Sequence, residues 1–148
     1  SSDADEYTGG ATIPAAQATA LRNGQQKGYY LNLDLTNDLS AIRWREFIGQ
    51  PGYDMVGAYE GGYQYAYGVW RPEQTSIMKQ SSAPGAAFNA PSRALIVQRL
   101  LKAAGESYSF NAFLTKDVIP PTTKGTAYFG SGEESHTPPF LDGRPTGW

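Results

Sequence analysis

The segment that most restricts the fold lies in the middle of the chain, at residues 53–70. It contains five of the ten tyrosines and four glycines, and Tyr63, Tyr65 and Tyr67 alternate with other residues. A period of two is typical of strands and glycine is a poor helix former, so the segment favours irregular strands or a hairpin around Gly61-Gly62. The helices are therefore expected on either side of it.

Two helices are predicted before this segment. Pro14 stands at the first position of an alanine-rich helix that continues to Lys27, and Gly28 marks its end. A second helix is predicted over residues 41–48, between a run of capping side chains and a Gly-Gln-Pro break. Residues 29–33 between them are expected to be extended. Three apolar residues of the second helix share one face: Trp44, Phe47 and Ile48.

Two further helices are predicted after the segment. The first covers residues 91–104 and closes on Gly105, and its predicted buried face consists of Leu95, Ile96, Leu100 and Leu101. The second follows the N-cap Ser109, and three apolar residues of its sequence lie on one side: Phe110, Phe113 and Leu114. We therefore expect an α+β fold that is irregular and mainly helical, with at most a small sheet.

The size and charge of the chain suit one domain. It has 148 residues, with 12 Lys+Arg against 14 Asp+Glu, and its basic residues are scattered singly. Nucleic acid is therefore not an expected partner. No run approaches the roughly 18 apolar residues that a membrane span requires. Residues 1–119 are expected to form the domain, whereas residues 120–148 are rich in Pro, Gly, Ser and Thr and are predicted to be an extended tail or linker.

Several common catalytic arrangements are excluded by the residues that are missing. The absence of cysteine excludes disulfides, cysteine-ligated zinc, iron–sulfur clusters and thiol nucleophiles. The sequence motifs of serine hydrolases, P-loop NTPases and dinucleotide-binding folds are also missing. The single histidine, His136, lies in a Ser/Thr/Pro-rich stretch and is interpreted as a solvated loop residue. No catalytic residue is assigned from these observations.

Two short stretches are candidates for parts of a metal site. The acidic group Asp3, Asp5 and Glu6 is either a solvated terminus or the source of an oxygen ligand for a zinc ion whose other ligands lie upstream. The run Ser76-Ile77-Met78 is typical of a Met-turn, in which a methionine thioether lies as an apolar floor under the metal. The alternative for this run is a pair of buried loop hydrophobes.

Taken together with four other stretches, these runs resemble the bacterial metallopeptidase family named for IgA-specific peptidases, especially its forms in gut Bacteroidetes. The resemblance covers residues 3–117, and its order and spacing are more specific than any single stretch. It rests on Ala4-Asp5-Glu6-Tyr7, Asn32 to Asp38, Tyr59 to Tyr63, Gly68 to Pro72, Ser76-Ile77-Met78 and Phe88 to Arg93.

The resemblance implies that residues 1–119 are the C-terminal part of a zinc peptidase domain, with a metzincin-like fold. Asp5 is then the third zinc ligand, with Glu6 as the alternative, and Met78 is the Met-turn residue. The HExxH-type helix of the family, with two histidine ligands and the glutamate base, is not in this chain. We therefore expect the chain to be inactive alone, with zinc absent or weakly bound.

The same resemblance implies three further properties. The partners are a protein or peptide substrate and the missing N-terminal part of the peptidase domain, and the location is extracellular or at the cell surface. The aromatic segment supplies candidates for a substrate cleft: Tyr63, Tyr65, Tyr67, Trp70 and Arg71. The structural alternative is that these rings form the core of the domain.

Two functions from other classes remain open. The chain is 13% aromatic, and aromatic rings such as that of Trp70 stack on sugars, so a glycan- or protein-binding module of a bacterial surface protein is the first alternative. The second is a structural or partner-binding domain that has lost its catalytic apparatus.

Overall fold

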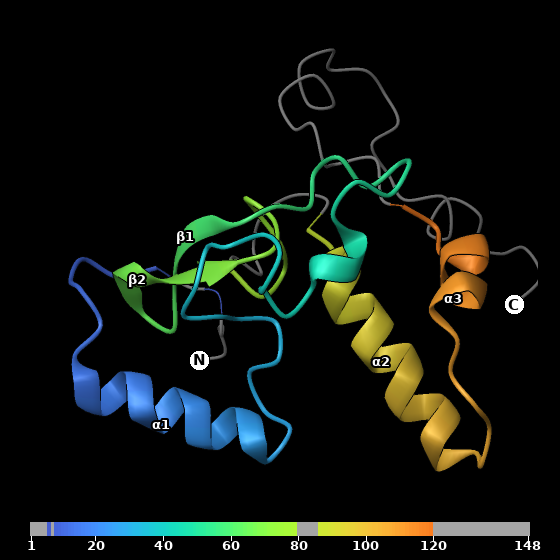
Figure 1. Ribbon diagram of the computed structural model, residues 1–148, viewed down its shortest axis with the longest axis horizontal. Helices are drawn as coiled ribbons and strands as arrows, with labels where there is room; N and C mark the ends of the chain where they lie inside the picture. The colour runs from blue at the N-terminus through green and yellow to red at the C-terminus, as the bar shows by residue number, and fades with distance from the viewer. Residues whose placement is uncertain (1–5, 7, 80–85, 120–148) are drawn as a thin grey trace, which may run out of the picture.

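The computed structural model describes Glu6 and residues 8–79 and 86–119, which form a small α+β fold (Figure 1). The elements follow one another as α1 (Ala15–Gln26), the 3-10 helix η1 (Arg45–Phe47), β1 (Tyr59–Gly62), β2 (Tyr65–Arg71), α2 (Ala90–Ala103) and α3 (Phe110–Lys116). The two strands form one antiparallel sheet. Figure 1 places α1 and the hairpin on one side, and α2 with α3 on the other. The predicted mixed fold with a small sheet is confirmed.

The predicted hairpin is confirmed, with its turn two residues later than Gly61-Gly62. Tyr59 pairs with Arg71 and Gly62 with Tyr65, and the register shifts between Glu60 and Gly62. The turn residues Tyr63 and Gln64 both have positive φ, at 52° and 70°, as a type I′ turn requires. Gly61 is needed at the irregularity because its φ is +106° and a Cβ there would lie 2.3 Å from the Thr8 side chain.

The first predicted helix is confirmed as α1, but the extended segment after it is wrong. Residues 29–33 turn, and Tyr30 has a φ of 54°. The Gln25 side chain holds this turn by donating to the carbonyls of Tyr30, at 3.2 Å, and Leu33, at 2.8 Å. These two carbonyls are therefore paired with the Gln25 side chain of α1 and not with the backbone of a neighbouring strand.

The predicted helix over residues 41–48 is also wrong, because only η1 is helical there. Two aspartate side chains accept backbone N–H groups that would pair with carbonyl oxygens in a helix. Asp34 Oδ2 accepts the N–H of Arg43 at 2.9 Å, and Asp38 accepts both the N–H and the hydroxyl of Ser40. Such local bonds compete with the helical ladder. The predicted shared face holds nevertheless, since Trp44 and Phe47 are buried and Ile48 packs against them.

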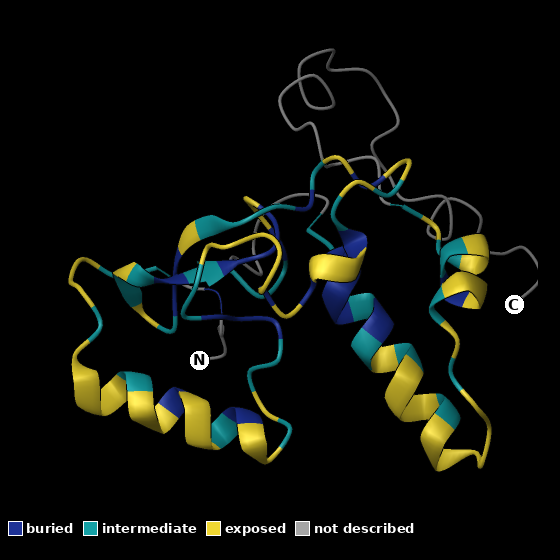
Figure 2. Cartoon of the chain, viewed as in Figure 1, coloured by how far each residue is buried: buried dark blue, intermediate teal, exposed yellow. Residues whose placement is uncertain are grey.

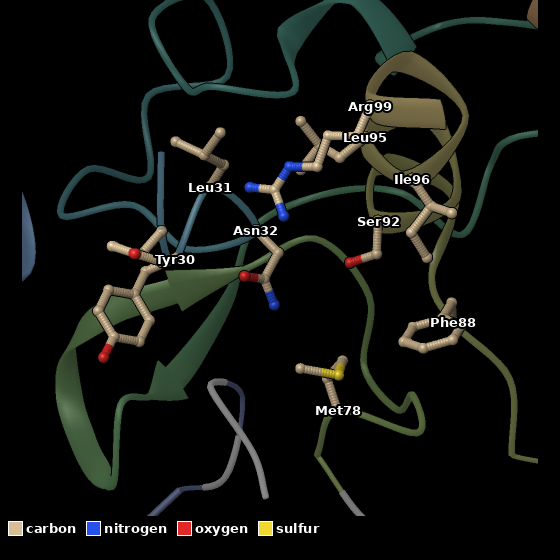
Figure 3. A pocket seen from close by; sticks show the side chains of 10 residues that line it. Tyr30, Leu31, Asn32, Met78, Phe88, Ser92, Leu95, Ile96 and Arg99 are labelled. Atoms are coloured by element: carbon tan, nitrogen blue, oxygen red, sulfur yellow. The ribbon is translucent and has the colours of Figure 1, made fainter. Parts of the chain in front are cut away.

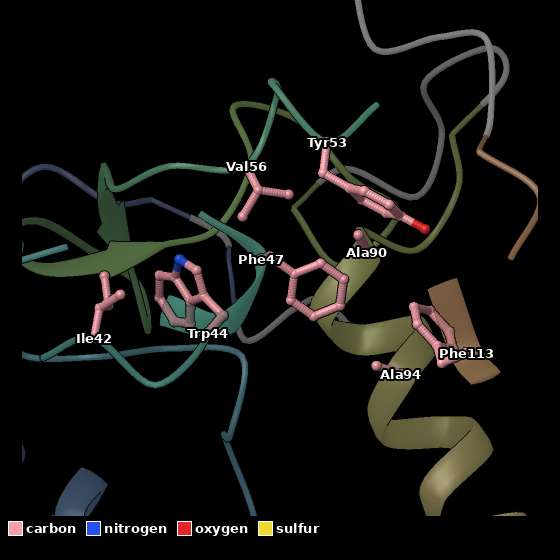
Figure 4. Packing of buried hydrophobic residues seen from close by; sticks show 8 residues of the cluster. All are labelled: Ile42, Trp44, Phe47, Tyr53, Val56, Ala90, Ala94 and Phe113. Carbon is pink, nitrogen blue, oxygen red and sulfur yellow. The ribbon is translucent and has the colours of Figure 1, made fainter. Parts of the chain in front are cut away.

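Two hydrophobic clusters stabilise the fold. The larger one joins η1 and the following loop to α2 and α3 (Figure 4). Phe47 lies at its centre, with ring centroids 4.9 Å from Phe110, 5.4 Å from Tyr53 and 6.0 Å from Phe113, all edge-to-face. The smaller cluster consists of Leu21, Leu33 and Val69 and fastens α1 to the hairpin.

Both C-terminal helices are confirmed, but the predicted buried face of α2 is wrong. The buried residues of α2 are in its first turns: Ala90, Pro91, Ser92 and Ala94. Ile96 is 39% exposed and Leu100 65% exposed. Figure 2 shows that the buried part of α2 is confined to its first turns. The N-terminal end of α2 enters the larger cluster, whereas in the described part of the chain its C-terminal half is largely open to solvent. A helix buries only the residues that meet a neighbour, whatever its own periodicity.

Two further expectations concern the chain as a whole. The tail predicted over residues 120–148 lies outside the described residues, as does His136. Among the residues that are described, no helix is both long enough and apolar enough to cross a membrane.

Candidate functional site

The candidate site is built around the carboxylate of Glu6, which is fully buried. Its Oε1 accepts hydrogen bonds from the carboxamides of Asn32, at 2.7 Å, and Asn89, and its Oε2 accepts one from the hydroxyl of Ser76. The Glu6 N–H donates to the carbonyl of Met78 at 3.2 Å. One residue therefore joins the turn after α1, the loop of Met78 and the start of α2.

The charge of this carboxylate is subject to opposing effects. Burial raises the pKa of Glu6, whereas the hydrogen bonds from Ser76, Asn32 and Asn89 and the nearby charge of Arg71 lower it. Charged carboxylates are costly to bury unless hydrogen bonds and an opposite charge compensate. The three donors and the arginine compensate only in part, because burial is the largest of these effects and the pKa of Glu6 is raised overall.

The Arg71 side chain lies near Glu6 and is held in place by backbone carbonyls. It is buried, and its guanidinium donates to the backbone carbonyls of Glu60 at 2.6 Å, Gly61 at 2.9 Å and Gln74 at 3.0 Å. Burial lowers the pKa of Arg71, and the charge of Glu6 opposes that shift. The side chain thus ties the hairpin to the loop that leads to Ser76 and places a positive charge near Glu6.

The start of α2 contributes two polar groups. Asn89 is the N-cap of α2: its Oδ1 accepts the N–H of Ser92 at 2.8 Å while its Nδ2 donates to Glu6. Glu73 accepts the N–H of Ala90 at 2.8 Å and is only 7% exposed. Both groups satisfy backbone donors that the first turn of a helix leaves unpaired.

The protonation of Glu73 gives a stability prediction. Burial raises its pKa from 4.5 to about 7, with Glu6 and Asp117 acting in the same direction and the Ala90 N–H and Arg93 acting against them. The folded state therefore binds more protons than the unfolded state between these values. Protonation of Glu73 therefore stabilises the folded state fully below pH 4.5, and this contribution is lost as the pH rises through 7. At 1.36 kcal/mol per pKa unit, the loss in the free energy of unfolding is about 3 kcal/mol.

The variant Glu73→Gln isolates this contribution because the amide oxygen can still accept the Ala90 N–H. We expect the stability of the wild type relative to Glu73→Gln to fall by about 3 kcal/mol between pH 4 and pH 8, measured by urea denaturation. The exposed Glu106 supplies the control, Glu106→Gln, which keeps the wild-type pH profile. A constant difference between wild type and Glu73→Gln would contradict the prediction.

The loop of Met78 borders a pocket of about 480 Å³ (Figure 3). Ser76 Oγ accepts the Met78 N–H at 3.1 Å while it donates to Glu6, and the Ile77 N–H donates to Ala87 at 2.8 Å. The loop is therefore held from both sides, and the Met78 side chain forms part of one wall. The pocket is lined by Tyr29, Tyr30, Leu31, Asn32, Met78, Phe88, Ser92, Leu95, Ile96 and Arg99.

The residues predicted for the site are only partly brought together. Glu6 and Met78 meet through the Glu6 N–H, although Met78 lies 72 positions further along the chain. Asp5 lies outside the described residues. The five cleft candidates belong to the hairpin and its turn, and none of them lines the pocket: Tyr63, Tyr65, Tyr67, Trp70 and Arg71.

Sequence reasoning missed the residues that surround Glu6. The family resemblance includes the stretches that contain Asn32, Ser76 and Asn89, but it implies no role for these three residues. The signal in the sequence is an uncharged hydrogen-bonding residue next to apolar ones. Asn32 lies between two leucines, Ser76 precedes Ile77, and Asn89 lies between a phenylalanine and an alanine. Glu73 lies just after the stretch Gly68 to Pro72 and was not predicted either.

A zinc ion would need more donors than this part of the chain brings together. Within Glu6 and residues 8–79 and 86–119, no three His, Cys, Asp or Glu side chains form a group that could hold a metal ion. Both oxygens of the Glu6 carboxylate are already occupied by protein donors. Catalytic zinc sites use three protein ligands and an open position, so the described residues do not fit a complete zinc site.

Comparison with known proteins supplies no relative from which a role can be transferred. No family model, no curated protein and no solved structure matches the chain. The roles of the residues are therefore argued from their geometry.

Proposed function

We propose that the chain is the C-terminal, metzincin-like part of a zinc-dependent metallopeptidase that hydrolyses peptide bonds in protein substrates with a metal-activated water. The observation that carries the proposal is the junction of Glu6 with the Ser76–Met78 loop. A metal ligand next to a thioether floor requires these two stretches, 70 residues apart, to lie against each other. The hydrogen bonds of Glu6 meet that requirement.

Within this proposal, Asp5 is the metal ligand and Glu6 is the anchor. The Glu6 carboxylate is buried and accepts from three side chains, so it is suited to fixing the chain beside it rather than to an open ligand position. Positioning groups of this kind hold a first ligand in place. Asp5 is the neighbouring carboxylate in the sequence.

The proposal assigns the other two ligands to another part of the peptidase. When bound, zinc supplies an activated water and polarises the peptide carbonyl. The histidines and the general base belong to an HExxH-type helix in the missing N-terminal part of the domain, so this chain alone has no peptidase activity. An extracellular or cell-surface location is part of the same proposal.

The test uses a longer protein that contains this chain together with an HExxH-type helix. We expect Asp5→Ala to lower the zinc content and the peptidase activity together, because a site with two histidines and no third ligand holds zinc weakly. Zinc content is measured by atomic absorption after dialysis, and activity on a casein substrate. The control is Asp54→Ala, at an exposed position, which leaves both unchanged. Full zinc occupancy in Asp5→Ala would refute the assignment.

Glycan binding is the second candidate function, and exposed aromatic rings favour it. Tyr29 is 61% exposed and Tyr67 57% exposed. Stacking platforms for sugars need rings presented to one ligand, but Tyr29 lines the pocket and Tyr67 lies on β2 outside it. The peptidase proposal is preferred because the geometry around Glu6 joins stretches that glycan binding leaves unexplained.

A further inference from the structure

The pocket between Met78 and α2 shares Met78 and Asn32 with the candidate site, and the rest of its wall has a chemical character of its own. Its volume of about 480 Å³ is within the range of roughly 300–1,000 Å³ for small-ligand sites. Most of its wall is aliphatic or aromatic, and Tyr29, Phe88 and Ile96 on that wall are among the most exposed apolar residues. An apolar group that entered would remove this surface from water.

The charge on the wall is of one sign. Arg99 is the single cation among the lining residues, and no carboxylate lines the pocket. One of its guanidinium nitrogens donates to the carbonyl of Gly28 at the other side. A guanidinium has five N–H donors, so this bond orients the group and leaves donors for a carboxylate. Figure 3 shows the Arg99 side chain extending from α2 toward Leu31 and Asn32.

Two uncharged polar groups complete the wall. Ser92 contributes a hydroxyl from α2, and Asn32 contributes a carboxamide. Figure 3 shows the Ser92 hydroxyl directed toward the space between α2 and Asn32. A hydroxyl and a carboxamide can hydrogen-bond to the amide group of a peptide, whereas the hydrocarbon chain of a fatty acid has no group to hydrogen-bond with them.

We propose that this pocket binds the C-terminal residue of a peptide. The large apolar side chain of that residue packs against Met78, Leu95 and Ile96, and the free carboxylate binds the guanidinium of Arg99. Ser92 and Asn32 meet the adjoining amide. The inference uses only described residues of this chain and does not depend on zinc, so it stands or falls separately from the peptidase proposal.

The test is an NMR titration of the full chain without metal, and the probe is N-acetyl-L-phenylalanine. We expect saturable binding that shifts the amide signals of Ser92, Leu95 and Ile96. N-acetyl-L-phenylalaninamide, which lacks the charge, is expected to bind about tenfold more weakly or worse, because it offers no carboxylate to the guanidinium of Arg99. N-acetylglycine, which lacks the apolar group, is expected not to saturate.

Two variants locate the carboxylate contact. Arg99→Gln is expected to weaken binding of N-acetyl-L-phenylalanine about tenfold, to the level of the amide, and to leave the amide unchanged. Lys102→Gln is the matched control because it removes a cation from the exposed last turn of the same helix, outside the pocket. The wild-type pattern of NMR signals shows that each variant is folded.

Several results would overturn the inference. These are no saturable binding, equal binding of acid and amide, or equal effects of Arg99→Gln and Lys102→Gln. Tighter binding of octanoate than of N-acetyl-L-phenylalanine would assign the pocket to fatty acids. Concentration-dependent dimerisation that Ile96→Ser abolishes and the probe does not disturb would assign this face to a second copy of the chain.

Discussion

Replacing Glu6 by alanine is expected to lower the free energy of unfolding by about 3–5 kcal/mol, because three buried donors lose their acceptor at a cost of about 1–3 kcal/mol each, and such costs are not fully additive. The change leaves the buried donors of Asn32, Ser76 and Asn89 without their acceptor, and it removes the negative charge near Arg71. Unsatisfied buried donors retain their desolvation cost while losing the bond. Domains of this kind have only about 5–15 kcal/mol in total, so the loss is a large share.

Urea denaturation of the wild type and variant measures this loss, and Glu106→Ala is the control at an exposed glutamate. The variant Glu6→Gln keeps the volume but turns one acceptor into a donor, so we expect it to be destabilised as well. A stability of Glu6→Ala within about 0.5 kcal/mol of the wild type, as for an ordinary surface change, would show that the carboxylate does not join the three segments.

The variant Phe47→Ala is expected to lose a comparable amount, about 3–5 kcal/mol, because it empties the centre of the larger cluster. The Phe47 ring meets Tyr53, Phe110 and Phe113, which come from the loop after η1 and from α3. The cavity would therefore open between the loop after η1 and α3. Thermal denaturation measures the loss as a fall in Tm.

Two variants bracket the Phe47 prediction. Phe47→Leu keeps an apolar group in the cluster and is expected to cost less than Phe47→Ala. Leu39→Ala removes an apolar side chain that is already 45% exposed and is not part of the larger cluster, so it is expected to change Tm little. A fall in Tm for Phe47→Ala no larger than that for Leu39→Ala would contradict the packing described for the larger cluster.

The elements that the sequence predicts correctly are those with strong local signals. Helices α1, α2 and α3 each have a proline, a cap or a closing glycine at their ends, and the Tyr/Gly alternation marks the hairpin. These signals involve residues that are close together in the sequence, so they can be recognised without knowing the tertiary contacts. The apolar face shared by Trp44, Phe47 and Ile48 is confirmed, whereas the helix predicted over residues 41–48 is not.

The elements that the sequence misses depend on distant partners. The helix expected over residues 41–48 is prevented in part by Asp34, whose side chain takes the N–H of Arg43. The burial of α2 is decided by which of its turns enters the larger cluster, so its apolar periodicity gave the wrong face. A local pattern shows which residues are able to be buried, but the tertiary contacts decide which of them are.

The candidate site is harder to predict from the sequence than the helices, because its residues lie far apart along the chain. Glu6 meets partners 26, 70 and 83 positions away, and no local pattern links them. The family resemblance places several of these stretches in one domain and implies Asp5, or Glu6 as the alternative, as a metal ligand, but it does not imply that Glu6 accepts hydrogen bonds from three buried side chains. Buried polar residues in otherwise apolar stretches are the signal to use in such a case.

A double-mutant cycle between Glu6 and Asn89 tests the central claim most directly, because it measures whether these two residues, 83 positions apart, act on each other. The stabilities of Glu6→Ala, Asn89→Ala and the double variant are compared with the wild type, so the loss of the α2 cap cancels from the coupling. The structure predicts a coupling energy of about 1.5–3 kcal/mol, as for a hydrogen bond to a charged group. Additivity within about 0.5 kcal/mol would contradict a site organised by the buried carboxylate.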